Sequence, residues 1–478
     1  MNNANAINLG ISYTADELPN EVFRNYDIRG FAHSQITPKF AYKLGATLAI
    51  ALLEQQYSAI YLGRDGRLSS PELAKSLAQG LAQYGIDVID IGVVSTPILN
   101  YAAHCDGNAD CGIMVTASHN AKEYNGFKIV VRDRVIAGEM LQTVKQKMLT
   151  DTPSTHQPGQ ITSSDITPHY LKAIMANCRP KKNFKIAIDC GNSIVGPLAL
   201  ELFQRLNYEV IPLFCEPDGN FPNHDPNPSD ENNLQQLQAA VLSHKADLGL
   251  AFDGDGDRLV VISGNGKIVW PDQLMMIFAR DILKTKPNTE IVFDVKSSFR
   301  LKQLVTELSG TPVICKTGHS HVRKAVEQTG ALVGGEFSGH IFFNDRWHGF
   351  DDGLYASVRL LEILANSDLE PKLALEKMIA DFKPSAYTPE ILIPVAESEK
   401  FALMEELISN CNFKDAIINT IDGLRVEYPL GWGLIRASNT SANLTMRFEA
   451  ENHDELARIK KLFSRALAPF INQMDQYL

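Results

Sequence analysis

Short apolar runs alternate with amphipathic stretches along most of the chain. Helical spacing over Pro38–Gln55 precedes an apolar run at Ala59–Leu62, and a second amphipathic stretch that begins at Ser70 precedes the run Val88–Ile91. Such short apolar runs are typical of buried strands. Strands that alternate with helices predict a mostly parallel sheet covered by helices. We therefore expect an α/β fold.

The same pattern recurs twice. Ile186–Asp189 and Ile291–Asp294 resemble Ile60–Asp65, because each is an apolar strand that ends near an aspartate and continues into a turn and a helix. These copies predict three related α/β domains.

A second repeat is sharper. Ala109–Val115 matches Ala246–Phe252, and Ala331–Gly335 is a looser third copy. Each of the three domains is therefore expected to send one functional loop from a similar strand.

A chain of 478 residues is too long for one core. Clusters of proline and glycine at Thr152–Gln160, Gly264–Gly266 and Phe382–Pro389 indicate joints. Beyond the last joint, the tail has strand and helix signals of its own and predicts a smaller α+β domain. The expected domains are residues 1–163, 164–264, 265–384 and 385–478.

The loop after the first of the sharper repeats carries Ser118, His119 and Asn120. A serine beside a histidine can be a nucleophile with a base at hand. These residue types also cap helices without any catalytic role, so the loop alone leaves both interpretations open.

The loop after the second copy carries Asp253, Asp255 and Asp257, followed by Arg258. Glycines between the aspartates allow the three carboxylates to converge, and hard oxygen ligands favour a hard cation. An EF-hand does not fit, because Arg258 stands where that loop needs glycine, and Gly264 stands where it needs glutamate. An incomplete cage with room for a phosphate oxygen favours Mg²⁺ over Ca²⁺.

Three further segments have residue types that bind phosphate or sugar. Glycine-flanked loops at Lys316–His321 and Gly335–His340 offer carboxylate, hydroxyl and imidazole groups for sugar hydroxyls. In the tail, Arg436–Ser441 combines arginine with hydroxyls and an amide, as a phosphate nest does. Two arginines flank Tyr26 in the segment Phe23–Gly30, which is either a phosphate clamp or a solvated turn.

Composition excludes several classes of protein. The net charge of −11 argues against nucleic-acid binding and against a coat on anionic membranes. The seven cysteines are scattered without a C-x-x-C pair, so neither a disulfide framework nor a zinc site is indicated. No apolar segment precedes Arg24 as a secretory signal would, and the apolar run Leu44–Leu53 is too short for a membrane span. We expect a cytoplasmic protein.

With these loops identified, the chain resembles the α-D-phosphohexomutase superfamily, and most closely its bacterial phosphomannomutase/phosphoglucomutase branch. The resemblance extends from about Phe23 to the end of the chain. It is carried by six motifs in order: FRNYDIRG, TASHN…YNGFK, DGDGDR, KTGHS, GEFSGH and RASNT. Two positions depart from the family pattern: Ala121 follows TASHN where proline is usual, and Phe337 replaces a more common methionine.

The resemblance implies four domains around a central cleft and a role for each motif. Ser118 would carry a phosphate, and Mg²⁺ would be held by that phosphate with Asp253, Asp255 and Asp257. The transfer site would contain His119, Lys128 and Arg258, with Lys128 and His340 as candidates for general acid–base work and Arg29 as a positioning cation. The substrate contacts would be Tyr26, Arg29, Lys296, His319 and His340, with Glu336 and Ser338 on the sugar's O3 and O4. The other phosphate would be held by Arg436, Ser438, Asn439 and Thr440.

The implied reaction interconverts hexose 1-phosphate and hexose 6-phosphate, with mannose and glucose as sugars and glucose or mannose 1,6-bisphosphate as intermediate and activator. This places the protein in carbohydrate metabolism that feeds nucleotide-sugar and polysaccharide biosynthesis. The expected partners are small hexose phosphates, with no nucleic acid or membrane, and the expected state is a monomer. Alternatives are a phosphoglucosamine mutase, a sugar-phosphate phosphatase and a non-catalytic binder of hexose bisphosphates.

Overall fold

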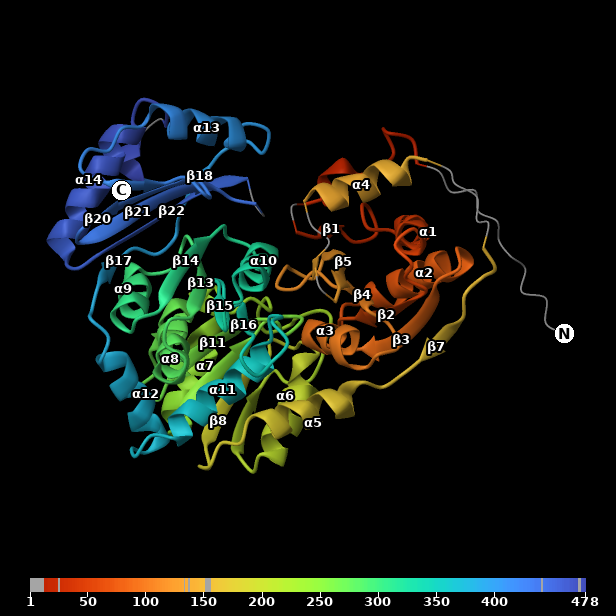
Figure 1. The fold of residues 1–478 in the computed structure, drawn as a ribbon, viewed down its shortest axis with the longest axis horizontal. Coiled ribbons are helices and arrows are strands. Elements are labelled where there is room, and N and C mark those ends of the chain that lie inside the picture. Colours follow the sequence, from red (N-terminus) through yellow and green to blue (C-terminus); the bar gives the residue numbers. More distant parts are fainter. Residues whose placement is uncertain are drawn as a thin grey trace.

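The computed structural model describes residues 13–24, 26–132, 134–135, 138–150, 156–439, 442–471 and 474–478. Strands within these ranges form four separate sheets of seven, five, four and six strands. In Figure 1 the domains around them run from the first at the right (red to orange), through the second and third, to the fourth at the upper left (blue). The predicted four-domain α/β fold is confirmed.

The first sheet has the order β1-β5-β4-β2-β3-β7, with β6 paired to β5. Its strands are β1 (Ile28–Phe31), β2 (Ala59–Arg64), β3 (Asp87–Val93), β4 (Cys111–Val115), β5 (Tyr124–Val131), β6 (Arg134–Val135) and β7 (Ile161–Ser163). Its helices are α1 (Pro38–Leu53), α2 (Ser70–Gln83), α3 (Thr96–Cys105) and α4 (Glu139–Met148). Helix α1 ends two residues before the predicted Gln55. It begins where Thr37 accepts a hydrogen bond from the Phe40 N–H and Pro38 fills the first turn.

The second sheet has the order β12-β11-β10-β8-β9, and the third β14-β13-β15-β16. The second domain contains α5 (Thr167–Asn177), β8 (Lys185–Asp189), α6 (Val195–Arg205), β9 (Glu209–Leu213), α7 (Glu231–His244), β10 (Leu248–Phe252), β11 (Leu259–Ser263) and β12 (Ile268–Val269). The third contains α8 (Pro271–Thr285), β13 (Glu290–Asp294), α9 (Phe299–Glu307), β14 (Thr311–Cys315), α10 (His319–Thr329), β15 (Val333–Gly335), β16 (Ile341–Phe343), α11 (Gly353–Ala365) and α12 (Pro371–Ala380).

The three sheets share one topology, which confirms the repeats seen in the sequence. A central strand (β2, β8 or β13) is parallel to a strand on each side. The second of these neighbours (β4, β10 or β15) then turns back into an antiparallel partner. Because this turn follows the carboxyl end of a parallel strand, each domain presents one hairpin loop at the edge where α/β proteins bind ligands.

The fourth domain is an antiparallel sheet with the order β17-β22-β21-β20-β19, and β18 also pairs with β22. Its strands are β17 (Ala386–Tyr387), β18 (Ile391–Pro394), β19 (Ile417–Asn419), β20 (Leu424–Tyr428), β21 (Gly431–Ala437) and β22 (Asn443–Ala450). Its helices are α13 (Lys400–Asn410) and α14 (His453–Leu467), followed by a short 3₁₀ turn at Met474–Gln476. Another short 3₁₀ turn, at Asn20–Val22, lies in the first domain. The β21–β22 turn carries the predicted phosphate loop.

One predicted joint has a different role in the structure. Gly264–Gly266 forms the hairpin turn between β11 and β12, where the Gly266 N–H donates to the Ser263 carbonyl over 2.8 Å and Gly266 has a φ of +81°. Linkers and tight turns use the same residue types, so composition alone did not separate them.

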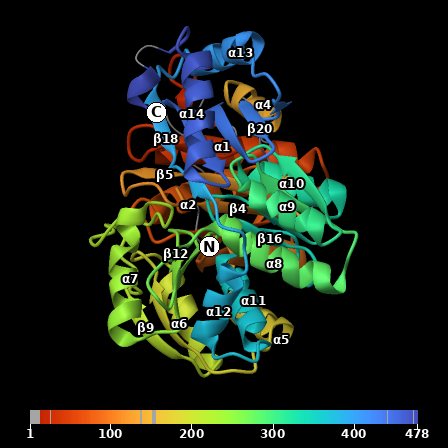
Figure 2. The same ribbon diagram turned by 90° about the vertical axis from the view of Figure 1, so that its left-hand side faces the viewer.

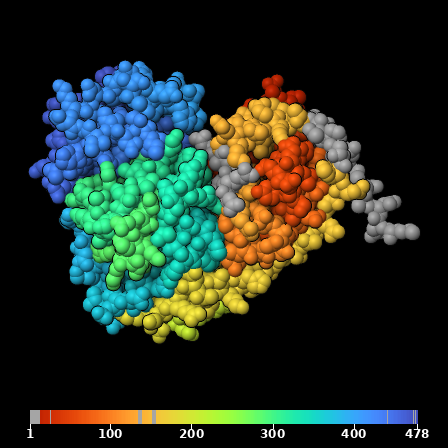
Figure 3. Space-filling model, viewed as in Figure 1, coloured from red at the N-terminus to blue at the C-terminus, as the bar shows by residue number. Residues whose placement is uncertain are grey.

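One apolar core spans the first three domains and includes Leu99, Leu202 and Phe293, and each of these domains also has a separate smaller core. The fourth domain has its own core around Phe448 and Phe463. Figure 2, turned by 90°, again shows the fourth domain at one end of the molecule, and Figure 3 shows the surface hollowed between it and the first domain. The fourth domain therefore joins the others through a surface rather than through the shared core.

That surface is buried and combines apolar packing, of Val295 and Phe299 against Trp432 and Leu434, with polar contacts. Glu449 of β22 accepts hydrogen bonds from Ser298 Oγ over 2.6 Å and from the Phe299 N–H over 3.2 Å, both in the third domain. Arg425 of β20 donates to the Val295 and Ser297 carbonyls.

None of the helices in the described ranges combines the length and apolar character that crossing a bilayer requires.

The contact between the first and third domains contains a histidine held neutral. The Nδ1 of His104 lies 2.7 Å from the Asn100 carbonyl, and its Nε2 lies 3.2 Å from a guanidinium nitrogen of Arg323 in α10. Burial, aided by the Arg323 charge, lowers the pKa of His104 to about 4. The unfolded chain therefore binds a proton below pH 6.5 that the folded protein takes up only near pH 4.

We expect acid to weaken this contact. The free energy of unfolding should fall by up to about 3 kcal/mol through His104 as the pH drops from 6.5 towards 4. A His104→Gln variant should lose this part of the pH dependence, while the exposed His453→Gln should keep the wild-type profile. Denaturant melts at several pH values measure the difference, and parallel profiles for all three proteins would contradict the expectation.

Candidate active site

One cavity of about 750 Å³ lies where the four domains meet. The predicted site residues on its wall are Tyr26, Arg29, His119, Arg258, Lys296, His319, Glu336, Ser338, His340, Arg436, Ser438 and Asn439. The others are buried directly behind it: Ser118, Lys128, Asp253, Asp255 and Asp257. Thr440 lies outside the described residues. Segments from the whole length of the chain thus meet in one cavity.

Ser118 occupies the turn between β4 and β5 and has a φ of +50°, which is rare for a residue with a side chain. Its Oγ donates to Asp253 Oδ2 over 2.8 Å and lies 3.2 Å from His119 Nδ1. A Cβ atom at Gly254 would lie only 2.3 Å from the Ser118 carbonyl oxygen. The glycine therefore allows the serine loop of the first domain to touch the aspartate loop of the second.

Asp253, Asp255 and Asp257 follow β10 and place carboxylate oxygens within 4.8 Å of one another. Lys128 of β5 donates to Asp255 Oδ2 and Asp257 Oδ2, each over 2.6 Å. Asp255 Oδ1 is buried and accepts no hydrogen bond from the described residues. Three buried carboxylates with an unsatisfied oxygen fit a hard divalent cation.

The charges of this cluster are coupled. Burial, with repulsion from Asp257 and Asp255, raises the pKa of Asp253. Burial opposes the charge of Lys128, but Asp255 and Asp257 outweigh it and raise the lysine pKa. Lys128 therefore remains protonated at neutral pH, and its one positive charge does not neutralise three carboxylates.

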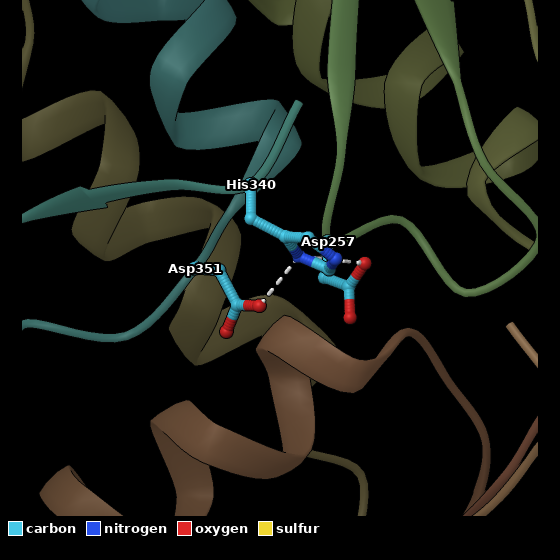
Figure 4. A group of neighbouring side chains, drawn as sticks. All are labelled: Asp257, His340 and Asp351. Carbon is cyan, nitrogen blue, oxygen red and sulfur yellow. Dashed lines mark ion pairs between the residues drawn. The ribbon is translucent and has the colours of Figure 1, made fainter. Parts of the chain in front are cut away.

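His340 is held between charged partners from two domains (Figure 4). Its Nδ1 lies 2.7 Å from Asp351 Oδ2 and 3.4 Å from Asp257 Oδ1, and its Nε2 accepts a hydrogen bond from Arg258 Nε over 2.9 Å. This arrangement puts the ring proton on Nδ1, facing the carboxylates. Burial lowers the pKa of His340, but Asp257 and Asp351 more than compensate, so its pKa is raised.

Two other histidines are neutral at pH 7. Burial, followed by the charges of Arg258 and Arg29, lowers the pKa of His119 far below its usual value. Burial also lowers the pKa of His319 to about 4. At neutral pH, both can accept or donate a hydrogen bond without adding charge to the cavity.

The far ends of the chain meet at Tyr26. Its hydroxyl donates to the Thr317 carbonyl over 2.8 Å and accepts a hydrogen bond from the Asn439 amide. Asp422 makes a parallel link, accepting from the Thr317 N–H and from Arg436 Nε, each over 3.0 Å. The first, third and fourth domains are thus connected around the phosphate loop.

Two more cations line the cavity near these groups. Arg29 of β1 is buried and donates to Asn120 Oδ1 over 2.6 Å and to Asp27. Lys296 Nζ lies 3.2 Å from Glu390 Oε1 of the fourth domain. The described lining of the cavity has six arginine or lysine side chains against five aspartate or glutamate side chains, in a protein whose net charge is −11. A cavity of this kind suits an anionic ligand.

Sequence comparison decides the family. Four domain models described as phosphoglucomutase/phosphomannomutase, α/β/α domains I, II and III and the C-terminal domain, match residues 20–154, 168–266, 270–382 and 390–466. The chain belongs to the phosphoglucomutase/phosphomannomutase family. The expected membership of the α-D-phosphohexomutase superfamily is thereby confirmed.

Individual members of the family match almost the whole chain. A phosphomannomutase/phosphoglucomutase of Pseudomonas aeruginosa is 45% identical over 454 residues, which are 95% of this chain and 96% of the relative. A probable phosphoglucosamine mutase of Methanosarcina barkeri is 33% identical over 442 residues, 91% of this chain and 97% of the relative. The crystal structure of a phosphoglucomutase/phosphomannomutase family protein from Burkholderia thailandensis has a TM-score of 0.88 at 40% identity and covers 95% of this chain and 98% of its own.

Sequence reasoning missed two carboxylates of this phosphoglucomutase/phosphomannomutase site. Asp351 contacts His340, and Asp422 links Thr317 to Arg436. The pair Asp351-Asp352 precedes α11 and resembles a helix cap, and Asp352 does accept from the Tyr355 N–H over 2.9 Å. A helix cap explains Asp352 but not Asp351. The unexplained second aspartate could have indicated a site residue.

Proposed function

We propose that this member of the family is a hexose-phosphate mutase, which moves a phosphoryl group between O1 and O6 of one hexose through phospho-Ser118. One observation carries the proposal: Ser118 Oγ lies 2.8 Å from Asp253 Oδ2, beside a cavity that also contains Arg436 and Ser438 of the fourth domain. A serine beside a cation site and a separate phosphate-binding loop together suit a substrate with two phosphorylation positions.

We propose that Asp253, Asp255 and Asp257 hold Mg²⁺ together with an oxygen of the serine phosphate. The cation would neutralise charge on the phosphoryl group during transfer. An N-acetylphosphoglucosamine mutase of Aspergillus fumigatus that shares the fold has been solved in complex with GlcNAc-6P and magnesium. The oxygens that would bind the metal are those that Lys128 leaves unsatisfied, above all Asp255 Oδ1.

In the proposed transfer, the bond between Ser118 Oγ and phosphorus breaks as the sugar hydroxyl oxygen bonds to the same phosphorus. The hydroxyl proton passes to a base, and the departing Ser118 oxygen regains a proton. Arg258 and Lys128 stabilise the charge of the moving group. Arg258 is close enough for this role, because its Nε lies 3.8 Å from Asp253 Oδ2.

His340 is better suited than Lys128 to general acid–base work. Asp255 and Asp257 raise the pKa of Lys128, so that it holds its proton firmly. His340 lines the cavity, and its Nε2 becomes a proton acceptor when the Arg258 Nε–H turns from it to the phosphoryl group. Asp351 supports the role by holding the Nδ1 proton. Arg29 acts as a positioning cation, and neutral His119 stays within hydrogen-bond distance of Ser118 Oγ.

The phosphate that is not transferred would bind Arg436, Ser438, Asn439 and Thr440, while Tyr26, Lys296 and His319 contact the substrate. The hexose 1,6-bisphosphate then turns end for end, and Ser118 takes back the other phosphate. Glucose or mannose 1,6-bisphosphate would activate the enzyme by phosphorylating Ser118. The turn requires the fourth domain to loosen, with a hinge near Pro384, whose carbonyl accepts from Arg300 over 2.8 Å.

Glu336 and Ser338 are proposed to bind the sugar's O3 and O4. These contacts do not read the configuration at C2, where glucose and mannose differ, so both sugars should be substrates. Hydrolysis by a phosphatase would require water to compete with a sugar hydroxyl that is positioned by residues from all four domains. The mutase is therefore favoured over the phosphatase.

A panel of substrates tests the proposed function. With Mg²⁺ and glucose 1,6-bisphosphate, we expect conversion of mannose and glucose 1-phosphates to 6-phosphates, slower conversion of glucosamine 1-phosphate, and release of inorganic phosphate slower than isomerisation. Coupled assays of hexose 6-phosphate and of free phosphate measure these rates. Phosphate release that outpaces isomerisation would favour the phosphatase, and a preference for glucosamine 1-phosphate would favour a phosphoglucosamine mutase.

Several broader expectations remain proposals: a monomer in the cytoplasm that supplies nucleotide-sugar and polysaccharide biosynthesis. The proposed domains are residues 1–163, 164–264, 265–384 and 385–478. β12 (Ile268–Val269) pairs with β11 of the second sheet. This pairing supports a boundary between the second and third domains after Val269, a few residues later than proposed.

A further inference from the structure

The aspartates at the ends of the three repeated strands have no role in the proposed chemistry. Asp65 follows β2, Asp189 ends β8 and Asp294 ends β13, so all three occupy the same place in the repeated topology. Each is buried, and none lines the cavity. A buried carboxylate at a repeated position needs hydrogen-bond donors, and the identity of these donors indicates its function.

We propose that Asp65 and Asp294 are positioning residues: Asp65 fixes the serine loop for phosphoryl transfer, and Asp294 fixes the two loops that bind the sugar. The proposal rests on the mutase function proposed above, because it assigns the two loops to different steps of that reaction.

Asp65 holds the serine loop through two connected routes. Its Oδ2 accepts from Thr116 Oγ1 over 2.7 Å, and Thr116 Oγ1 in turn accepts from the Ser118 N–H over 2.9 Å. Both of its oxygens also accept from Arg67, Oδ1 from the N–H over 3.1 Å and Oδ2 from Nε over 3.0 Å. The carboxylate thus fixes Ser118 through Thr116 and also fixes the orientation of a buried guanidinium.

That guanidinium is the second route to the loop. Arg67 is 1% exposed and donates to four backbone carbonyls, that of the nucleophile itself and three in the residues that follow it. The acceptors are the carbonyls of Ser118 (2.8 Å), Asn120 (2.6 Å), Ala121 (2.7 Å) and Tyr124 (3.2 Å). Ser118 has a φ of +50°, a conformation that persists only where its surroundings hold it.

Asp294 connects two loops of the third domain. Its Oδ2 accepts from Thr317 Oγ1 over 3.0 Å, in the loop that leads to His319. Its Oδ1 accepts from the Phe337 N–H over 3.2 Å, between Glu336 and Ser338, and from Ser297 Oγ over 2.8 Å. One carboxylate therefore sets the separation of the loops that present the sugar-binding groups.

We call hydrogen bonds from such an aspartate to a functional loop a tether. Asp189 shows that the repeated position alone does not create one. It accepts from the Gly191 N–H over 2.9 Å and lies 3.2 Å from His224 Nε2. The aspartate loop of its domain is held instead by Asp253, whose Oδ1 accepts from the Gly256 and Arg258 N–H groups. The inference is therefore limited to the first and third domains.

The donors decide which substitution breaks each tether. At Asp65, each oxygen faces an Arg67 N–H, so the amide of Asp65→Asn meets a donor in either orientation. At Asp294, the Asn amide can turn its NH₂ to the Thr317 hydroxyl, which also accepts, and keep its oxygen for the Phe337 N–H. Asp65→Asn should therefore be severe and Asp294→Asn mild, while Asp294→Ala removes the tether altogether.

The two tethers predict opposite kinetic signatures with glucose 1-phosphate. Asp65→Asn should lower kcat about 100-fold with KM nearly unchanged, because only the nucleophile is misplaced. Asp294→Ala should raise KM about 10-fold with a smaller effect on kcat, and Asp294→Asn should stay within about 3-fold of wild type. The matched control is Asp247→Asn, which removes a carboxylate that accepts from the Lys185 N–H over 2.8 Å at the opposite end of the second sheet.

Amide hydrogen exchange provides a readout that does not depend on turnover. Exchange should accelerate in residues 116–124 of Asp65→Asn and in residues 317–319 and 336–340 of Asp294→Ala, with the other loops unchanged. If Asp65→Asn fails to fold, Thr116→Val removes the same link to Ser118 at similar volume. Equal changes of kcat and KM in both variants, or exchange rates in both that match Asp247→Asn, would overturn the proposal. A wild-type protein without mutase activity would refute the proposed function instead, and the exchange pattern would still test the tethers.

Discussion

Replacing Ser118 with alanine should abolish mutase turnover. The side-chain oxygen is the proposed carrier of the phosphoryl group, and it donates to Asp253 of the proposed cation site over 2.8 Å. Loss of a covalent nucleophile should lower kcat by at least about 10⁴-fold. The measurement is the rate of glucose 6-phosphate formation with saturating glucose 1,6-bisphosphate, together with the intact mass of the purified protein.

A matched control separates chemistry from packing. Ser357 of α11 is as deeply buried as Ser118, and its Oγ donates to the Leu354 carbonyl over 2.6 Å, away from the cavity. Ser357→Ala should keep near wild-type turnover and the added mass of one phosphate. A Ser118→Ala protein that folds, still turns over at the wild-type rate and still carries the phosphate would refute the proposed mechanism.

Much of the fold could be predicted because repeats and periodicity are local signals. Short windows of sequence show the strands near Ile60, Ile186 and Ile291. They also show the loops that follow Val115 and Phe252. The structure adds their common topology, in which β4, β10 and β15 each end in a hairpin at the same edge. Turns and linkers share their residue types, as the Gly264–Gly266 turn illustrates, so composition alone does not distinguish them.

The residues of the site also differ in how well the sequence predicts them. Residues within motifs, such as Ser118 and His340, could be found because several chemical groups stand together in the sequence. The roles of Asp351, Asp65 and Asp294 could not be predicted, although the residues were visible, because their partners are distant in the chain or are backbone groups that every residue carries. A single aspartate after a strand is ordinary, and only the fold shows which donors surround it.

Substitution of Asp255 with asparagine should weaken both metal binding and turnover. Asp255 is completely buried, its Oδ2 accepts from Lys128 over 2.6 Å and from Thr96 over 2.5 Å, and its Oδ1 is left for a cation. The amide can occupy the same space but supplies a neutral ligand in place of a charged one. We expect the Mg²⁺ concentration for half-maximal activity to rise by about 10- to 100-fold and kcat to fall by about 10³-fold.

Thermal stability gives the second measurement of the same cation site. Binding of Mg²⁺ to the folded protein should raise the Tm of the wild type in proportion to the logarithm of free Mg²⁺, and the Asp255→Asn protein should show little rise over the same range. A chelator should abolish wild-type turnover, and Mg²⁺ should restore it. Asp345→Asn breaks an ion pair with Arg359 at 2.7 Å outside the cavity and should keep the wild-type metal response. Full turnover of thoroughly chelated enzyme would contradict the cation site, because the reaction would then need no positive charge at Asp255 Oδ1.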